Sequence, residues 1–223
     1  MKIRNLLLSL LAASSIAVAA SSQAQETVES TFVMWNNGSF DRFIVEKHTN
    51  YNQFNKVIVL PLKYDELVVE TGKSKKLRKN WEGFAEEDMP ALATRFAELA
   101  ANEFEKDEGR LVLTENGGED VLLISVNLLR LEPLVYRDSS MATVGEETFE
   151  VVGFLDYQVT IMDSKGGIVA GLIEDSIKVA LRRKSKNIRG NHFRAWVRTF
   201  EHILEKFNDD MMVLSANSPI GNS

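Results

Sequence analysis

The sequence predicts an α/β fold: a two-layer sandwich in which a mixed, mostly antiparallel sheet of about five strands carries two amphipathic helices on one face. Two observations predict it. Apolar residues recur at helical spacing in two separate segments, and strand-like apolar patterns precede and separate them. Each helix has one apolar stripe that needs a surface to cover, and a single sheet face is the simplest surface that serves both.

The first strand and the first helix are predicted from an apolar run and a set of helix signals. Residues 57–62 are a continuous, β-branched apolar run that ends around Pro61, which is typical of a buried strand. Asp88 suits a helix N-cap and Pro90 falls in the first turn, so we expect a helix over residues 88–107. Its apolar stripe consists of Leu92, Phe96, Leu99, Ala100 and Phe104.

Four further strands are expected at residues 111–113, 121–131, 151–161 and 169–181. The first expected strand, the helix and the strand at 111–113 form a crossover unit. The glycine-containing turns at residues 115–120 and 163–167 predict hairpins between the later strands, which makes the sheet mixed.

A second helix closes the predicted domain, with Asn191 as its N-cap. A second stripe at helical spacing consists of Phe193, Trp196, Val197, Phe200, Leu204, Phe207 and Met211. We expect Phe96 and Phe200, one from each stripe, to be buried against the sheet.

The N-terminus has the pattern of a cleavable bacterial signal peptide. Lys2 and Arg4 precede an uncharged run at residues 6–20, and small residues follow at the spacing of a cleavage site after Ala24 or Ala19. The run has 15 residues, and a membrane span needs roughly 20, so an uncleaved anchor is the weaker alternative. We therefore expect a periplasmic or secreted protein without a transmembrane span in the mature chain.

Four segments are predicted along the chain. Residues 1–24 form the signal peptide, 25–55 an aromatic-containing N-terminal arm, 56–214 the single α/β domain and 215–223 a flexible tail. The arm's aromatic residues lack clean periodicity, so we expect their rings to lie in grooves of the domain; stacking on a sugar or a peptide is the alternative.

Composition excludes several classes of protein. The chain has no cysteine, which excludes disulfides, thiolate chemistry and the lipid-bearing cysteine of a bacterial lipoprotein. Loss of the signal peptide shifts the formal net charge from −6 to −8, because that segment contains Lys2 and Arg4 and no acid. A domain this acidic is no general binder of nucleic acid or anionic membranes, so any anion site must be local.

The strand at residues 56–61, the Ala-rich amphipathic helix and the following strand meander resemble a bacterial domain-of-unknown-function family of envelope lipoproteins, number 3313. The resemblance covers about residues 50–214 and is one of pattern and order. The missing lipidated cysteine departs from the family's lipoprotein form. The family has no established activity, so the resemblance implies no functional residues.

No catalytic constellation, metal site or cofactor site emerges from the sequence. The three histidines have no metal-binding spacing, and no Gly-x-Ser-x-Gly motif is present. Acidic neighbours are the remaining candidates for acid–base chemistry, although such neighbours usually diverge in space. They are Glu86-Glu87-Asp88, Glu119-Asp120, Glu146-Glu147 and Asp209-Asp210.

Two basic runs are the candidate site for an anion or a partner. The first contains Arg182, Arg183, Lys184, Lys186 and Arg189, and the second contains Lys73, Lys75, Lys76, Arg78 and Lys79. The first run is expected between the last strand and the last helix, where cations oppose the helix dipole unless anions lie nearby. Neutralisation by the domain's own acids or plain solvation is one interpretation; an anion held by side chains and helix amides together is the other.

These observations favour an exported, non-enzymatic domain that binds a partner in the bacterial cell envelope, with peripheral membrane contact included. The partner is an envelope protein or an anionic ligand that the sequence does not identify. The alternative is an envelope hydrolase that uses carboxylate chemistry. Two or more of the acids above converging in a cleft would favour the enzyme, whereas a filled domain with an exposed patch would favour the binding module.

Overall fold

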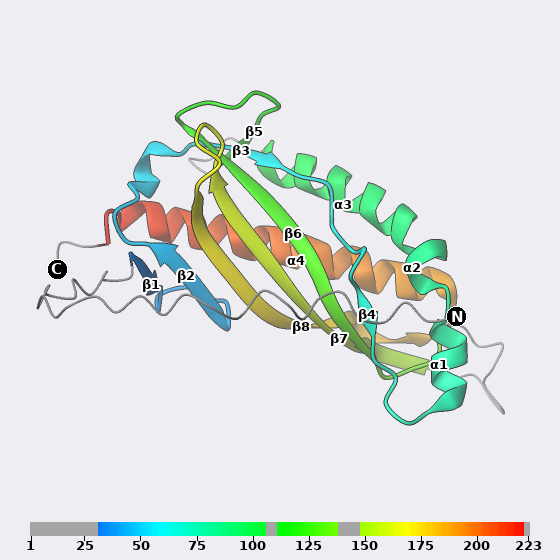
Figure 1. The fold of residues 1–223 in the computed structure, drawn as a ribbon. Coiled ribbons are helices and arrows are strands. Elements are labelled where there is room, and N and C mark those ends of the chain that lie inside the picture. The colour runs from blue at the N-terminus through cyan, green and yellow to red at the C-terminus, as the bar shows by residue number, and fades with distance from the viewer. Residues whose placement is uncertain (1–30, 106–110, 138–147, 221–223) are drawn as a thin grey trace, which may run out of the picture. The chain divides into compact units, whose positions relative to one another are not determined.

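The computed structural model describes residues 31–105, 111–137 and 148–220. In this part of the chain, two long helices, α3 (Met89–Phe104) and α4 (Arg189–Ala216), cover one face of an eight-stranded sheet (Figure 1). The predicted class is therefore confirmed, although the sheet has more strands than the five expected.

The strands follow the order β1-β2-β8-β7-β6-β3-β5, and β4 pairs with β6 outside this path. Their bounds are β1 Phe32–Met34, β2 Arg42–Glu46, β3 Lys56–Val59, β4 Val68–Val69, β5 Val112–Leu113, β6 Val121–Pro133, β7 Thr148–Asp163 and β8 Val169–Lys186.

The long antiparallel strands β6, β7 and β8 form the middle of the sheet, as their apolar patterns predict. Strand β8 extends beyond the predicted end at Leu181, because Ser185 and Lys186 still pair with the start of β7. Gly153 of β7 lies opposite Pro133 of β6, and a Cβ at this glycine would come within 2.4 Å of the Glu132 carbonyl oxygen. The close approach of the two strands therefore requires glycine at this position.

Strand β3 lies between β5 and β6 and is parallel to both. The crossover from β3 through α3 to β5 is therefore as expected. The turn at residues 115–120 does not form the predicted hairpin, because β5 and β6 run in the same direction on either side of β3.

The described part of the expected N-terminal arm joins the sheet. Strand β2 pairs with β8 and β1 pairs with β2, and a short 3-10 helix, η1 (Tyr51–Gln53), follows. Strands β1 and β2 were not predicted, because strands of three and five residues are too short to stand out among irregularly spaced aromatics. Five of the arm's rings are buried in the core: Trp35, Phe40, Phe43, Tyr51 and Phe54.

The C-terminal segment is hydrogen-bonded to the same region. Helix α4 continues to Ala216, and the Ser218 hydroxyl donates to the Thr49 carbonyl and accepts from the Tyr51 amide. Within the segment expected to be a flexible tail, Ser215 and Ser218 thus form hydrogen bonds with residues far away in the sequence.

Two short helices, α1 (Lys75–Trp81) and α2 (Phe84–Glu87), precede α3 and were not predicted. Gly83 joins them with a φ of 77°, a left-handed conformation that glycine adopts without strain. The last helix begins at Arg189 with Ile188 as its N-cap, not at the predicted Asn191. The Asn191 side chain instead donates to the Lys186 carbonyl.

The core joins the two long helices through aromatic rings. Phe96 and Phe200, exposed by only 1% and 0%, meet edge to face with centroids 5.5 Å apart. Phe104 and Phe207 make a second such contact at 6.5 Å. These pairs confirm the predicted burial of Phe96 and Phe200 and attach α3 and α4 to each other as well as to the sheet.

We predict that Phe96→Ala and Phe200→Ala each lower the free energy of unfolding by about 3–5 kcal/mol, because each leaves a large cavity in the core. Chemical denaturation measures this loss. The control is Phe193→Ala, which truncates a 37% exposed ring on the same helix and should cost far less. The double variant should show a coupling energy of about 0.5–1.5 kcal/mol from the lost ring contact. Unchanged stability in both single variants would contradict this assignment of the core.

Candidate functional site

The first basic run is divided between a strand and a helix. Arg182, Arg183 and Lys184 lie near the end of β8, are exposed, and have no ion pair within the described ranges. Lys186 ends the strand, and Arg189 begins α4. The expected position of the whole run between strand and helix is wrong, because β8 pairs with β7 again at Ser185 and Lys186, after a bulge at residues 181–184.

The second run forms helix α1 together with Lys73, which precedes it. Ser74 caps this helix, its hydroxyl accepting from the Leu77 amide at 3.2 Å. The run's cations are exposed, and none has an ion pair with another described residue: Lys73, Lys75, Lys76, Arg78 and Lys79. The local sequence folds as a helix because Trp81 is buried at its end while the charged residues remain in solvent.

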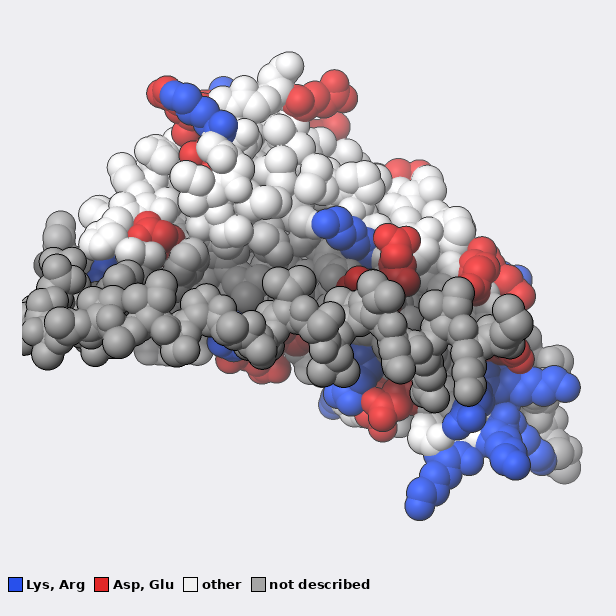
Figure 2. Space-filling view, viewed as in Figure 1, with Lys and Arg blue, Asp and Glu red and all other residues white. Residues whose placement is uncertain are grey.

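Both runs lie at the same end of the sheet, around the buried His192 ring. The Trp81 ring of α1 is 6.2 Å from His192, and the Phe149 ring, on the β7 residue paired with Ser185 of β8, is 4.4 Å from it. Figure 2 shows Lys and Arg side chains gathered at this end, over α1. We call the exposed cations at α1 and at residues 182–184 of β8 the basic pole: Lys73, Lys75, Lys76, Arg78, Lys79, Arg182, Arg183 and Lys184.

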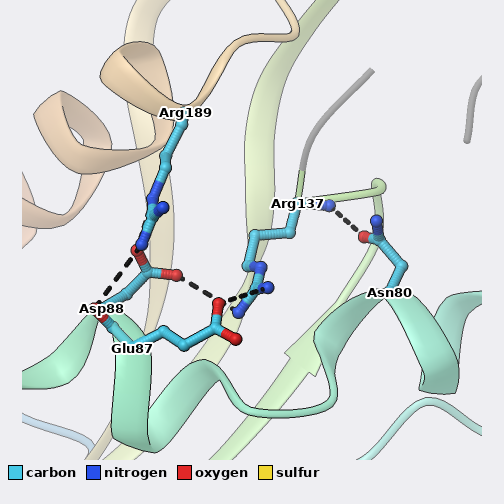
Figure 3. Close-up of polar contacts among 5 residues, drawn as sticks. All are labelled: Asn80, Glu87, Asp88, Arg137 and Arg189. Atoms are coloured by element: carbon cyan, nitrogen blue, oxygen red, sulfur yellow. Dashed lines mark hydrogen bonds and ion pairs between the residues drawn. The ribbon is translucent and has the colours of Figure 1, made fainter. Parts of the chain in front are cut away.

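Arg189 lies outside the basic pole because it belongs to a closed ionic network (Figure 3). Its Nε lies 2.7 Å from Oδ1 of Asp88, whose Oδ2 faces the guanidinium of Arg137 at 3.3 Å. Arg137 also binds Glu87 at 2.8 Å, and its amide donates to Asn80. Two cations thus face two carboxylates, and the Asp88 and Arg137 side chains are only 14% and 15% exposed. The network therefore holds α2, α3 and α4 together and leaves no charge for a ligand.

A groove of about 930 Å³ separates β8 from α4. Arg182 lines it together with Arg194 and Arg198 of α4, two cations that the sequence analysis missed. They lie four residues, or about one helical turn, apart on the polar side of the helix, outside the apolar stripe that the sequence predicts. That spacing was a signal in the sequence, but a solvated helix face has the same pattern.

The other end of the groove contains acids and a buried ion pair. Glu201 and Glu205 of α4 line it, and the Lys206 ammonium lies 2.8 Å from the Asp175 carboxylate of β8. The Tyr157 hydroxyl donates to the same carboxylate at 2.8 Å. Asp175 was not predicted as a functional residue. The sequence nevertheless indicates that it is unusual, because it is a carboxylate at an inward-facing strand position between Ile173 and Ile177.

These contacts shift the titration of Asp175. Burial opposes its ionisation, but hydrogen bonds from Lys206 and Tyr157 outweigh burial, so the pKa of the Asp175 carboxyl lies below its usual range. Burial, with the negative Asp175 beside it, raises the pKa of Tyr157, which therefore stays protonated and remains a donor. The cluster fixes the register of α4 on β8 and offers no free proton acceptor.

The acidic neighbours proposed for acid–base chemistry do not converge in this groove. Glu119 pairs with Lys165 and Asp120 with Lys56, near the start of β6. Glu87 and Asp88 belong to the ionic network, and Asp210 accepts from the Ser39 amide at 2.7 Å. Glu146 and Glu147 lie outside the described residues.

Within the described ranges, no cluster of three or more His, Asp or Glu side chains is placed to bind a metal ion. His192 packs in the core on Asn187, and His202 lines the groove. No described helix combines the length and hydropathy needed to cross a bilayer.

Comparison with known proteins gives only distant likenesses. No family model matches the chain, and no curated protein does. The PelC dodecamer from Paraburkholderia phytofirmans is 12% identical, with 69% of this chain and 89% of that one covered and a TM-score of 0.35. Protein XCC0632 from Xanthomonas campestris, of the unknown-function family DUF330, is 9% identical, with 74% and 88% covered and a TM-score of 0.43. A putative neuraminyllactose-binding hemagglutinin homolog from Helicobacter pylori is 12% identical, with 73% and 92% covered and a TM-score of 0.36.

The expected membership of family 3313, and its lipoprotein form, are not confirmed by these matches. XCC0632 belongs to a different family of unknown function. Likenesses at this level assign neither a family nor an activity to this chain.

We predict that acid destabilises the protein partly through Asp175. Since its folded-state pKa is lowered, its contribution to stability is present above the unfolded pKa of about 4 and is lost as pH falls through the folded value. Asp175→Asn should lower stability at neutral pH and flatten the loss of stability below about pH 4. Urea denaturation across pH measures both effects. Glu115→Gln, which removes an exposed carboxylate, is the control, and an unchanged acid dependence in Asp175→Asn would contradict the assigned role.

Proposed function

We propose that this chain is an exported, non-enzymatic domain of the bacterial cell envelope that binds an anionic partner through the basic pole. The observation that carries the proposal is the meeting of the two basic runs at one end of the sheet, with exposed cations that have no ion pair in the described chain. The mature chain is expected to have a net charge of −8, so this concentration of positive charge is a local exception.

The contacts of the candidate acids support binding rather than catalysis. Five of them are paired with cations or a backbone amide in different parts of the fold: Glu87, Asp88, Glu119, Asp120 and Asp210. The groove's own carboxylates, Glu201 and Glu205, adjoin the ion pair of Lys206 with Asp175. Among the residues that the structure describes, no nucleophile hydrogen-bonded to a base accompanies them. Electrostatic attraction by exposed cations needs no such arrangement.

The proposal predicts binding to anionic vesicles that weakens steeply with salt, because exposed charges are screened beyond about 8 Å at physiological ionic strength. Vesicles of phosphatidylglycerol with phosphatidylcholine are the probe, and sedimentation measures binding. Changing Arg182, Arg183 and Lys184 together to Ser should weaken binding by roughly 100-fold, since a Lys or Arg near an anionic surface contributes about 1 kcal/mol.

The matched control changes Lys56, Lys63 and Lys165 to Ser, which removes the same charge from residues outside the basic pole. This control should bind as the wild type does. Equal binding by both triple variants at every salt concentration would refute a local anion site. Circular dichroism of each variant checks that the fold is kept.

Export is the second part of the proposal, and it rests on the pattern of the first 24 residues. We predict that the chain, expressed in a Gram-negative host, is recovered from the periplasm or the medium. N-terminal sequencing should place its first residue directly after Ala24 or Ala19. Replacing Leu6, Leu7 and Leu8 with Glu should abolish processing, and a wild-type protein that still begins at Met1 would contradict export by cleavage.

A further inference from the structure

The outer edge of β8 is only partly used by the sheet. The strand has 18 residues, and its inner edge pairs regularly with β7 up to Ala180 and again at Ser185 and Lys186, with residues 181–184 forming a bulge between them. On the outer edge, β2 pairs only with residues from Gly171 to Glu174. No other strand of the described chain pairs with this edge, so within the described residues the backbone from Ser176 to Ala180 is a free strand edge, which the bulge at residues 181–184 follows.

This edge borders the groove between β8 and α4, whose volume of about 930 Å³ lies in the range of ligand-binding clefts. Half-buried Ile177 and Leu181 of β8 and Val197 of α4 line it. A strand added to the edge would therefore have main-chain partners on one side and an apolar floor for alternate side chains.

The charges select an acidic occupant. The free edge carries Lys178, the bulge that follows it carries Arg182, Arg183 and Lys184, and the two together contain no acid. Helix α4 runs antiparallel to β8, and Arg194 and Arg198 line the groove from its N-terminal part. Glu201 and Glu205 follow one and two turns later, toward the pair of Lys206 with Asp175. The groove is therefore positive near the end of β8 and more acidic toward the middle of the strand.

The same charges disfavour a second copy of this chain. Two β8 edges paired with each other would place cations opposite cations or neutral residues, never opposite a carboxylate, over the whole free segment. Like charges directly opposite each other destabilise strand pairing. The occupant that fits is a segment of another protein.

We propose that the free edge of β8 binds an extended, acidic segment of a partner protein as an added strand, with its carboxylates near Arg182 and Arg198. This inference rests on the proposed partner-binding function and adds the chemistry and conformation of the partner. Main-chain hydrogen bonds supply affinity, and the cations together with the apolar floor supply selectivity.

The probe is a displayed library of random linear peptides, panned against the full mature domain. Enriched peptides should alternate apolar with acidic residues. The strongest of them is then synthesised in two forms, one unmodified and one N-methylated at every second residue. N-methylation removes the amide donors along one edge and leaves every side-chain charge in place, so it should weaken binding about tenfold or more.

Protein variants separate the groove from the rest of the basic pole. Arg182→Glu with Arg198→Glu should weaken the unmodified peptide about tenfold or more, whereas Lys75→Glu with Lys76→Glu on α1 should leave it bound. Lys63→Glu, away from both surfaces, is the charge control. Hydrogen exchange should show new protection of amides between Ser176 and Ala180 in the complex.

The possible negative results distinguish strand addition at β8 from anion binding by the basic pole. Vesicle binding that persists while no peptide is enriched refutes strand addition but keeps the proposed function, and the edge cations then only prevent unwanted pairing. A peptide bound equally well after N-methylation refutes strand addition in the same way. A peptide bound through the groove without any vesicle binding supports strand addition and overturns binding by the basic pole as a whole.

Discussion

Rings on α4 decide how the two layers fit together. Phe200 and Phe207 meet Phe96 and Phe104 of α3, and Trp196 stacks on Phe84 of α2, with centroids 5.5 to 6.5 Å apart. Because one stripe of α4 serves both the sheet and the neighbouring helices, the helix cannot move sideways without breaking these contacts. The side of α4 opposite this stripe then lies beside the outer part of β8, and core side chains do not fill the space between them. The groove is thus a consequence of core packing, and it needs no dedicated structural element.

The two ends of this groove differ because a charge buried in the protein must be paired, whereas a charge in solvent need not be. At one end the Asp175 carboxylate is 4% exposed, and a carboxylate at that depth must be paired. Lys206 and Tyr157 satisfy it, so this end is closed and structural. At the other end Arg182 remains in solvent, where an unpaired cation costs little and stays available. The buried pair sets the register of α4 on β8, and that register determines which cations of the helix face those of the strand.

Sequence reasoning predicted the long elements and missed the short ones. Strands β6 to β8 and helices α3 and α4 have enough repeats of their period to be recognised, whereas β2 has five residues and α1 has seven. Both runs of the basic pole are evident in the sequence. That they lie at the same end of the sheet could not be predicted, because it depends on Trp81 and Phe149 packing against His192. The groove could not be predicted at all, because it joins residues of β8 and α4 whose relative placement is fixed only by tertiary contacts. From the sequence alone Arg198 has the pattern of any solvated helix residue, and only the structure shows that it lines the same groove as Arg182.

The structure also changes where an anion could bind. The sequence suggested that cations crowd the start of the last helix, where an anion would be held by side chains and helix amides together. Only Arg189 occupies that start, and Asp88 already supplies the carboxylate that offsets its unfavourable position against the helix dipole. The cations left exposed lie at α1 and in the bulge of β8, and the bulge follows a free strand edge whose amides point along the sheet rather than converging on a point. A strand edge of this kind suits an extended chain better than a compact ion, because it presents its donors and acceptors in a row.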